Sequence, residues 1–209
     1  MNAPERLDPA RTALLFFDML NGHVKKEDPA TKARYAPVIA RAVRLLEAAR
    51  RAGVVVMYAA AHHRPDNATS ARLATDTDNR LRPIPSGTAR ELKPVVAAGT
   101  WEAQVIDELK PQPQDYMIPK FRWSAFHQTY LDLALRNRNV DTLLISGGST
   151  DVGVASTAYA ARDLDYNLII VSDACTSPEQ DNHAQFMRRV FPRMARVRTT
   201  EEVLRMLAA

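Results

Sequence analysis

The sequence has a single cysteine, Cys175, among its 209 residues, and it has no long uninterrupted apolar run. One cysteine excludes an intrachain disulfide framework and is typical of a reducing compartment, so we expect a cytoplasmic protein. A helix that crosses a bilayer needs roughly 20 apolar residues, and no stretch approaches that length. Residues 1–11 carry acidic and basic side chains without an apolar segment, so we expect no secretory signal and no membrane association.

The sequence also lacks a block of either charge, although its net charge is +4. Its 28 basic and 24 acidic residues are interspersed, which is typical of a solvated surface. It contains no basic strand interleaved with aromatic residues, no zinc knuckle and no pattern of a recognition helix. We therefore expect no nucleic-acid partner, and a small anionic substrate is the second interpretation of the excess positive charge.

Short apolar runs rich in Val, Ile, Leu and Phe alternate with amphipathic stretches along the chain. Because the apolar runs do not alternate with polar residues, they are typical of parallel strands that are buried on both faces. The sequence therefore predicts a three-layer α/β/α sandwich with a mostly parallel central sheet, in a single domain over residues 1–209. The predicted strands are 12–18, 54–60, 116–119, 142–146, 167–171 and 194–198, and the predicted helices are 37–52, 101–109, 129–138, 153–163, 178–190 and 201–207.

Local signals delimit some of these elements. Gly53 follows the first predicted helix as a left-handed C-terminal glycine would, and Thr100 stands where a helix cap would precede residue 101. Residues 64–99 are polar and weakly periodic, so we expect a long excursion over one end of the sheet. Such excursions commonly line or cover a site.

Two charged residues stand at predicted strand ends, where open α/β sheets bind their ligands. Asp18 ends the first strand after four apolar residues, so it is either a partly desolvated carboxylate that handles a proton or an aspartate that anchors the loop. Lys120 follows the third strand and a mostly apolar stretch comes after it, which favours a site residue over a surface one. A lysine beside a buried aspartate would hold the carboxylate charged or stabilise a developing anion.

A glycine-rich turn joins the fourth predicted strand to the next helix, from Gly147 to Gly153. Glycines permit a close backbone approach that a Cβ would prevent. The N–H groups of Val152, Gly153 and Val154 are candidates to face an anionic atom from the helix start, and we also place Gly148 and Ser149 in this pocket. The spacing does not fit a dinucleotide-binding fingerprint.

Several further side chains are candidates for the same pocket. Arg122 would pair with a substrate carboxylate or with an acidic neighbour, and Trp123 follows the site lysine closely enough to line the pocket. The remaining predicted binding residues are histidines: His23, His127 and one of the adjacent pair His62 and His63. Of this pair we choose His62. Adjacent histidines on an extended segment point to opposite faces, so we predict no metal site, and we expect no cofactor.

Four segments of the chain resemble the motifs of the isochorismatase-like hydrolase superfamily, which includes isochorismatases, cysteine hydrolases and nicotinamidases. Residues 17–23 (Phe-Asp-Met-Leu-Asn-Gly-His) resemble its hydrophobic-Asp-Met-Gln-Asn-Asp-Phe motif, and residues 120–126 (Lys-Phe-Arg-Trp-Ser-Ala-Phe) resemble Lys-x-Arg-Tyr-Ser-Ala-Phe. Residues 147–154 (Gly-Gly-Ser-Thr-Asp-Val-Gly-Val) are similar to Gly-hydrophobic-Ala-Thr-Asp-x-Cys-Val, and residues 173–175 are similar to a later Asp-Ala-Cys. In this order and at this spacing the resemblance is specific.

The resemblance implies that Asp18, Lys120 and position 153 form a catalytic triad, with a cysteine normally at the third position. This chain has Gly153 there, so covalent cysteine catalysis is excluded for the sequence as it stands. Cys175 cannot replace the nucleophile, because it matches a structural cysteine of the family. The resemblance also implies a cis peptide bond between Gly148 and Ser149, and a homo-oligomer, since the family commonly buries its pocket loops between subunits.

Isochorismatases of siderophore and phenazine pathways also have glycine at that position, and they hydrolyse a vinyl ether without a covalent intermediate. Our first hypothesis is therefore a hydrolase of an enol ether similar to isochorismate, with Asp18 as general acid or base beside Lys120. Thr150 and Asp151 resemble the cysteine-hydrolase branch instead. The alternatives are an amide hydrolase in which glycine replaced the cysteine, naturally or by engineering, and a catalytically silent member that binds a ligand or a partner protein.

Overall fold

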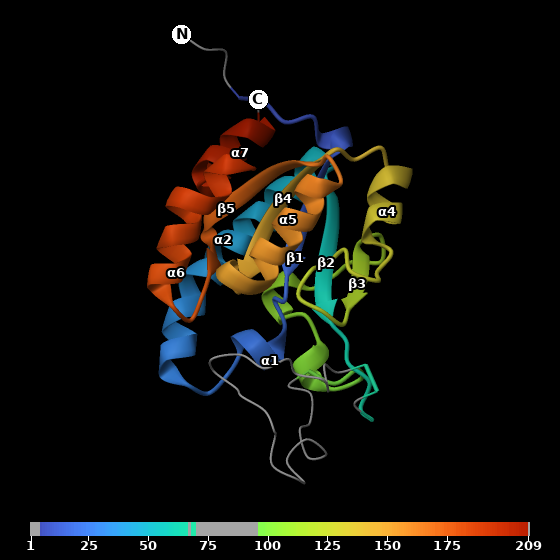
Figure 1. The fold of residues 1–209 in the computed structure, drawn as a ribbon, viewed down its shortest axis with the longest axis vertical. Coiled ribbons are helices and arrows are strands. Elements are labelled where there is room, and N and C mark those ends of the chain that lie inside the picture. The colour runs from blue at the N-terminus through green and yellow to red at the C-terminus, as the bar shows by residue number, and fades with distance from the viewer. Residues whose placement is uncertain (1–4, 67, 70–95, 209) are drawn as a thin grey trace.

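The computed structural model describes residues 5–66, 68–69 and 96–208, and within them it shows a six-stranded sheet between two layers of helices (Figure 1). The strands lie in the order β3-β2-β1-β4-β5-β6, and all neighbouring strands are parallel. This architecture confirms the predicted fold class. The strands are β1 (Thr12–Phe17), β2 (Val55–Ala61), β3 (Tyr116–Lys120), β4 (Thr142–Gly148), β5 (Asn167–Thr176) and β6 (Arg196–Arg198).

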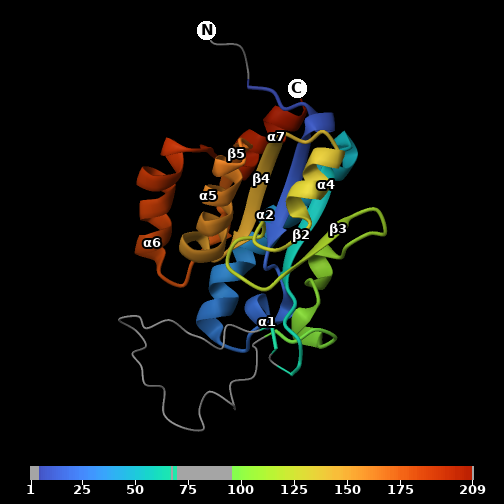
Figure 2. The same ribbon diagram turned by 45° about the vertical axis from the view of Figure 1, so that its right-hand side comes forward.

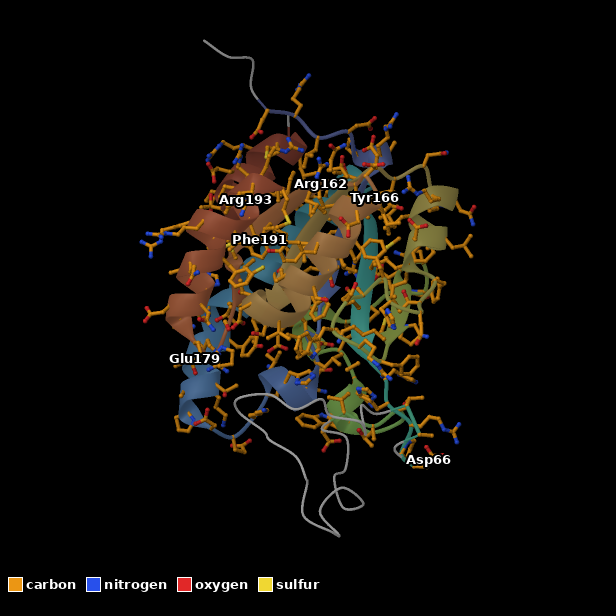
Figure 3. The ribbon with its side chains drawn as sticks, viewed as in Figure 1. Asp66, Arg162, Tyr166, Glu179, Phe191 and Arg193 are labelled. Carbon is orange, nitrogen blue, oxygen red and sulfur yellow. The ribbon has the colours of Figure 1, made fainter. Side chains whose placement is uncertain are left out.

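The helices cover both faces of the sheet because each buries one apolar stripe against it. On one face α2 and α7 pack against alternate residues of β1, β4 and β5, and on the other face α4 and α5 pack against the remaining residues (Figure 2). Tyr166 and Phe191, which Figure 3 labels, are fully buried in the hydrophobic cluster on the face of the sheet that α4 and α5 cover. The helices are α1 (Asn21–Val24), α2 (Pro29–Ala52), α4 (Leu131–Asn137), α5 (Ala155–Asp163), α6 (Gln180–Gln185) and α7 (Thr200–Ala208).

Two predicted helices differ from the observed ones. Helix α2 begins at Pro29 rather than at Pro37, because the Asp28 carboxylate accepts the N–H of Thr31 at 2.8 Å and caps the earlier start. Its other end is as predicted, with Gly53 at φ +77°. Residues 101–109 form no continuous helix but two 3-10 turns, Trp101–Ala103 and Asp107–Leu109.

The interruption between these two turns has a tertiary cause. Val105 makes an antiparallel bridge to Leu20, so the chain is extended where the amphipathic pattern predicts a helix. Thr100 caps no helix with its side chain, and its hydroxyl donates to the Ala97 carbonyl at 2.8 Å instead. Of the predicted excursion over residues 64–99, only 64–66, 68–69 and 96–99 belong to the described residues, so most of that prediction lies outside them.

The predicted helices 153–163 and 178–190 begin or end with π-helical turns. Residues Thr150–Val154 form such a turn before α5, and Phe186–Val190 form one after α6. The 3-10 turn Phe191–Arg193 leads to β6, and another, Pro9–Arg11, precedes β1. Within the described residues, no helix has both the length and the apolar character that a membrane crossing requires.

The sheet order changes direction between β1 and β4, and the carboxyl ends of the strands open a crevice there. Phe17, the last residue of β1, pairs with Ala59 of β2 on one side and with Gly147 of β4 on the other. Lys120 pairs with Ala61 one strand further out. Helix α1 lies beneath these strand ends (Figure 1). The carboxyl ends of β1, β3 and β4, where the sequence analysis placed the candidate site residues, therefore meet at one edge of the sheet.

Gly147 is fixed by this close packing of β1 and β4. Its φ is +124°, and a Cβ would lie 2.1 Å from the Phe17 carbonyl oxygen. We expect Gly147→Ala to lower the free energy of unfolding by about 3 kcal/mol or more, because it adds a backbone clash to a glycine-only conformation. Gly53→Ala is the matched control: it meets no atom within 4 Å and should cost only about 1 kcal/mol.

Urea unfolding followed by circular dichroism measures both variants. Equal losses of stability in the two would show that the Phe17 contact does not constrain Gly147.

Candidate active site

Asp18 leaves the sheet with a left-handed backbone, φ +49°, which aspartate tolerates better than most residues. Its N–H donates to the Ala59 carbonyl at 2.9 Å, and its Oδ1 accepts the N–H of Ala61 at 3.0 Å. These two bonds fasten the residue to β2 and leave Oδ2 for another partner.

That partner is Lys120, whose Nζ lies 2.7 Å from Asp18 Oδ2. Only 6% of the lysine side chain and 14% of the aspartate side chain are exposed. The ammonium also lies 4.5 Å from the centre of the Phe17 ring, a cation–π distance. Lys120 is the last residue of β3 rather than a loop residue, because the edge position of β3 tolerates Pro119 within the strand. The two charges form a buried ion pair, a site for proton transfer or for an anion.

The glycine-rich turn begins at the end of β4 and continues into the π-helical turn. The peptide bond between Gly148 and Ser149 is cis, as the resemblance implied. The N–H groups of Val152 and Val154 both donate to the Ser149 carbonyl, at 3.4 and 3.1 Å. Two of the three N–H groups predicted to face an anion are therefore bonded within the turn, because the π-helical start closes on itself.

A cavity of about 350 Å³ opens between these strand ends. Eight of the residues that the sequence singled out line it: Asp18, His23, Lys120, Trp123, Gly148, Ser149, Val152 and Gly153. Five lining residues were missed by the sequence analysis: Phe17, Lys26, Arg34, Tyr35 and Pro178. Lys26 and Arg34 come from α2 and the loop before it, where no strand-end rule applies, so the sequence offered no signal for them.

Three predicted binding residues do not line this cavity. Arg122 is exposed and donates to the Thr69 carbonyl at 3.0 Å, and His127 is exposed as well. His62 is also exposed, whereas His63 turns inward and buries its Nδ1 without a hydrogen-bond partner. The two side chains differ because consecutive residues of this extended segment point to opposite sides, and His63 does not line this cavity either.

Burial governs the two titratable neighbours of the ion pair. Burial lowers the pKa of His23 below its usual value, against the opposing influence of the Asp18 carboxylate and with the help of the Lys120 charge. Burial likewise raises the pKa of Tyr35 to about 12. Both side chains are therefore neutral near pH 7, and they line the cavity as hydrogen-bonding groups.

A second polar cluster supports the turn. The Asp151 carboxylate accepts hydrogen bonds from Ser149 (2.5 Å), Ser177 and Asn182 (2.7 Å). Burial opposes these bonds, but together they lower the pKa of Asp151 below its usual value. His183 is half-buried, and its Nδ1 lies 2.9 Å from Thr150 Oγ1. Among the described residues, no group of three or more His, Cys, Asp or Glu side chains is arranged to hold a metal ion.

Gly153 is buried in the cavity wall beside Phe17. A Cβ at this position would lie 2.2 Å and 2.4 Å from two carbons at the far edge of the Phe17 ring. Cys175 lies in β5 and does not line this cavity; it is buried, with its Sγ 3.6 Å from the Ile145 carbonyl oxygen of β4. Burial raises the pKa of its thiol to about 12, so it is an unreactive core residue.

The shift of His23 predicts a pH dependence of stability. Because its pKa is lower in the folded protein than in the unfolded chain, the unfolded chain binds more protons as the pH falls below about 6.5. Stability should therefore fall between pH 7.5 and 5.5, and His23→Phe should lose less stability over that interval than the wild type. Thermal unfolding at both pH values measures this, with exposed His127→Phe as the control. Equal pH dependence in the wild type and His23→Phe would contradict the prediction.

Comparison with known protein families gives one match over nearly the whole described chain. The family model of the isochorismatase domain matches residues 12–202.

Individual relatives agree with this match. An uncharacterized isochorismatase family protein from Escherichia coli O157:H7, YecD, is 44% identical over 93 residues, which are 44% of this chain and 50% of that protein, so the match spans about half its length. The ureidoacrylate amidohydrolase RutB of Pseudomonas savastanoi pv. phaseolicola is 31% identical over 82% of this chain and 73% of its own. The crystal structure of a cysteine hydrolase from Pseudomonas syringae pv. phaseolicola superimposes with a TM-score of 0.81 and 26% identity, covering 100% of this chain and 99% of that one.

Proposed function

Because the chain belongs to the isochorismatase family of hydrolases, we propose that it hydrolyses a small anionic molecule without a covalent enzyme intermediate. The observation that carries this proposal is the buried Asp18–Lys120 ion pair beside Gly153, which offers no nucleophilic side chain. In this proposal a water molecule supplies the oxygen, and the pair transfers the protons.

The first substrate class is an enol ether that bears a carboxylate. Lys120 passes a proton along its 2.7 Å contact to Asp18, which delivers it to the terminal carbon of the double bond. Water then adds to the resulting cation and returns a proton to the pair through the Asp18 carboxylate. The hemiketal so formed collapses to an alcohol and a keto acid, which balances the addition of one water.

A ureide is the second candidate, and the likeness to ureidoacrylate amidohydrolases favours it. Here the Asp18 carboxylate takes a proton from the water that attacks the carbamoyl carbon. Lys120 gives a proton to the departing nitrogen, so the C–N bond is replaced by a C–O bond. Both substrate classes use the same pair, and they differ in the atom that receives the first proton.

Charge supports an anionic substrate in either case. Among the described residues that line the cavity, Lys26, Arg34 and Lys120 are cationic, and Asp18 alone is acidic and already paired. The Arg34 Nε is buried without a hydrogen-bond partner, and one terminal nitrogen makes a long bond of 3.3 Å to Thr31 Oγ1. A guanidinium with unused donors beside a cavity is suited to a carboxylate.

Substitution of Asp18 tests the role of the pair. We expect Asp18→Asn to lower kcat by about 10²–10⁴-fold, because the amide cannot relay the proton. Exposed Asp107→Asn is the control. Turnover is measured on carboxylated enol ethers, by the keto acid formed, and on ureides, by the ammonia released. Reaction in D₂O separates the two: enol-ether hydrolysis places one deuterium on the new methyl group.

Equal rates for the wild type and Asp18→Asn would remove Asp18 from the mechanism. Consumption of neither substrate class by the wild type would favour a protein that binds a ligand without turning it over.

Arg34 provides a separate test of the substrate charge. Arg34→Gln should raise KM for the anionic substrate by about tenfold or more with little change in kcat, because the residue binds the substrate away from the reacting atoms. Arg34→Lys should recover only part of the affinity, since a lysine keeps the charge but loses the two-pronged geometry. An unchanged KM in both variants would place the anionic group elsewhere.

A further inference from the structure

We propose that Phe17 is the residue that makes glycine obligatory at position 153, and that it thereby keeps a nucleophilic side chain from this position beside the Asp18–Lys120 pair. This inference deepens the proposed function, because it explains why hydrolysis here proceeds without a covalent step. The steric part of it stands on geometry alone.

The contact between the two positions leaves no room for a side chain. A Cβ at position 153 would lie 2.2 and 2.4 Å from two Phe17 ring carbons and 3.2 Å from a third. Non-bonded carbon atoms pack at about 3.5–4.0 Å, so any residue larger than glycine must displace the ring. The Phe17 ring thus occupies the space in which a cysteine side chain at position 153 would start.

The ring cannot move away at low cost. Phe17 is 1% exposed, and it ends the central strand β1 with Ala59 on one side and Gly147 on the other. It packs in the buried cluster between the sheet and helices α4 and α5. The Lys120 ammonium lies 4.5 Å from the ring centre. The ring could move only into the cavity that it already lines. There it would exclude the substrate, and Lys120 would lose its contact with the ring.

Phe17 and Gly153 are therefore a coupled pair. Introducing a cysteine at position 153 alone would give either a strained protein or a thiol shielded by the ring. Shortening Phe17 at the same time would open the position beside Lys120, whose positive charge favours a reactive thiolate. The pair therefore differs from an ordinary packing contact in a chemical property: a thiol at position 153 should become reactive only when Phe17 is shortened.

Thiol labelling of the full chain tests the inference without any substrate. The native Cys175 is buried and has a pKa raised to about 12, so it contributes little labelling in the folded protein. Three variants are compared: Gly153→Cys, Phe17→Val, and the double variant. With iodoacetamide at pH 7.5, we expect the double variant to label at least tenfold faster than Gly153→Cys, and Phe17→Val to label as slowly as the wild type. Labelling in denaturant gives the total thiol count of each variant.

Gly153→Ala covers the case in which the cysteine variants fail to fold, since its Cβ suffices for the clash. We expect Gly153→Ala to lower Tm by about 5 °C. Phe17→Val should lower the Tm by less when it is added to Gly153→Ala than when it is added to the wild type, because the two positions are energetically coupled.

Two results would overturn the inference. One is a Gly153→Cys protein with the Tm of the wild type whose thiol labels as fast as that of the double variant. The other is a Gly153→Ala protein with the Tm of the wild type. Because neither measurement involves turnover, a failure of the proposed hydrolase reaction would leave these results unchanged, and the two ideas fail separately.

Discussion

The buried ion pair between Asp18 and Lys120 is the contact on which the arrangement of the site depends. It joins residues at the ends of two strands that are separated in the sheet by β2, and the backbone of Ala61 in β2 donates to the same carboxylate. Removing one partner of such a pair leaves an uncompensated charge in a place with little water, which commonly costs about 3–5 kcal/mol. The strand ends, the lysine stem and the Phe17 ring are therefore fixed relative to one another before a ligand arrives.

The turn after β4 supplies the opposite wall under a different constraint, which is space. Gly147 approaches the Phe17 carbonyl, Gly148 approaches the hydroxyl of Tyr35, and Gly153 approaches the Phe17 ring. A Cβ at any of the three would lie under 3 Å from a neighbouring atom. Phe17 of β1 thus contacts both ends of the turn. Its backbone therefore restricts which residues fit at position 147, and its side chain restricts which residues fit at position 153.

Charge and space together define what the cavity can accept. Its described cationic residues outnumber its acidic one, and that acidic residue already has a partner. The neutral His23 and Tyr35 add hydrogen-bonding groups without adding charge near pH 7. These properties agree with a family of hydrolases, and the chemistry that we propose uses water as the only nucleophile.

The amino-acid sequence by itself determined the layer architecture, the strand ends and the meeting of Asp18, Lys120 and the glycine turn. These follow from local patterns: buried parallel strands are continuously apolar, and their carboxyl ends share one edge of the sheet. Only the tertiary structure decided that Arg34 and Lys26 reach the cavity, that His63 rather than His62 turns inward, and that residues 101–109 are interrupted by a bridge to Leu20. It also revealed the contact between Phe17 and Gly153. The physical reason is that no local pattern and no strand-end rule governs these features, which depend on which side chains approach one another in space.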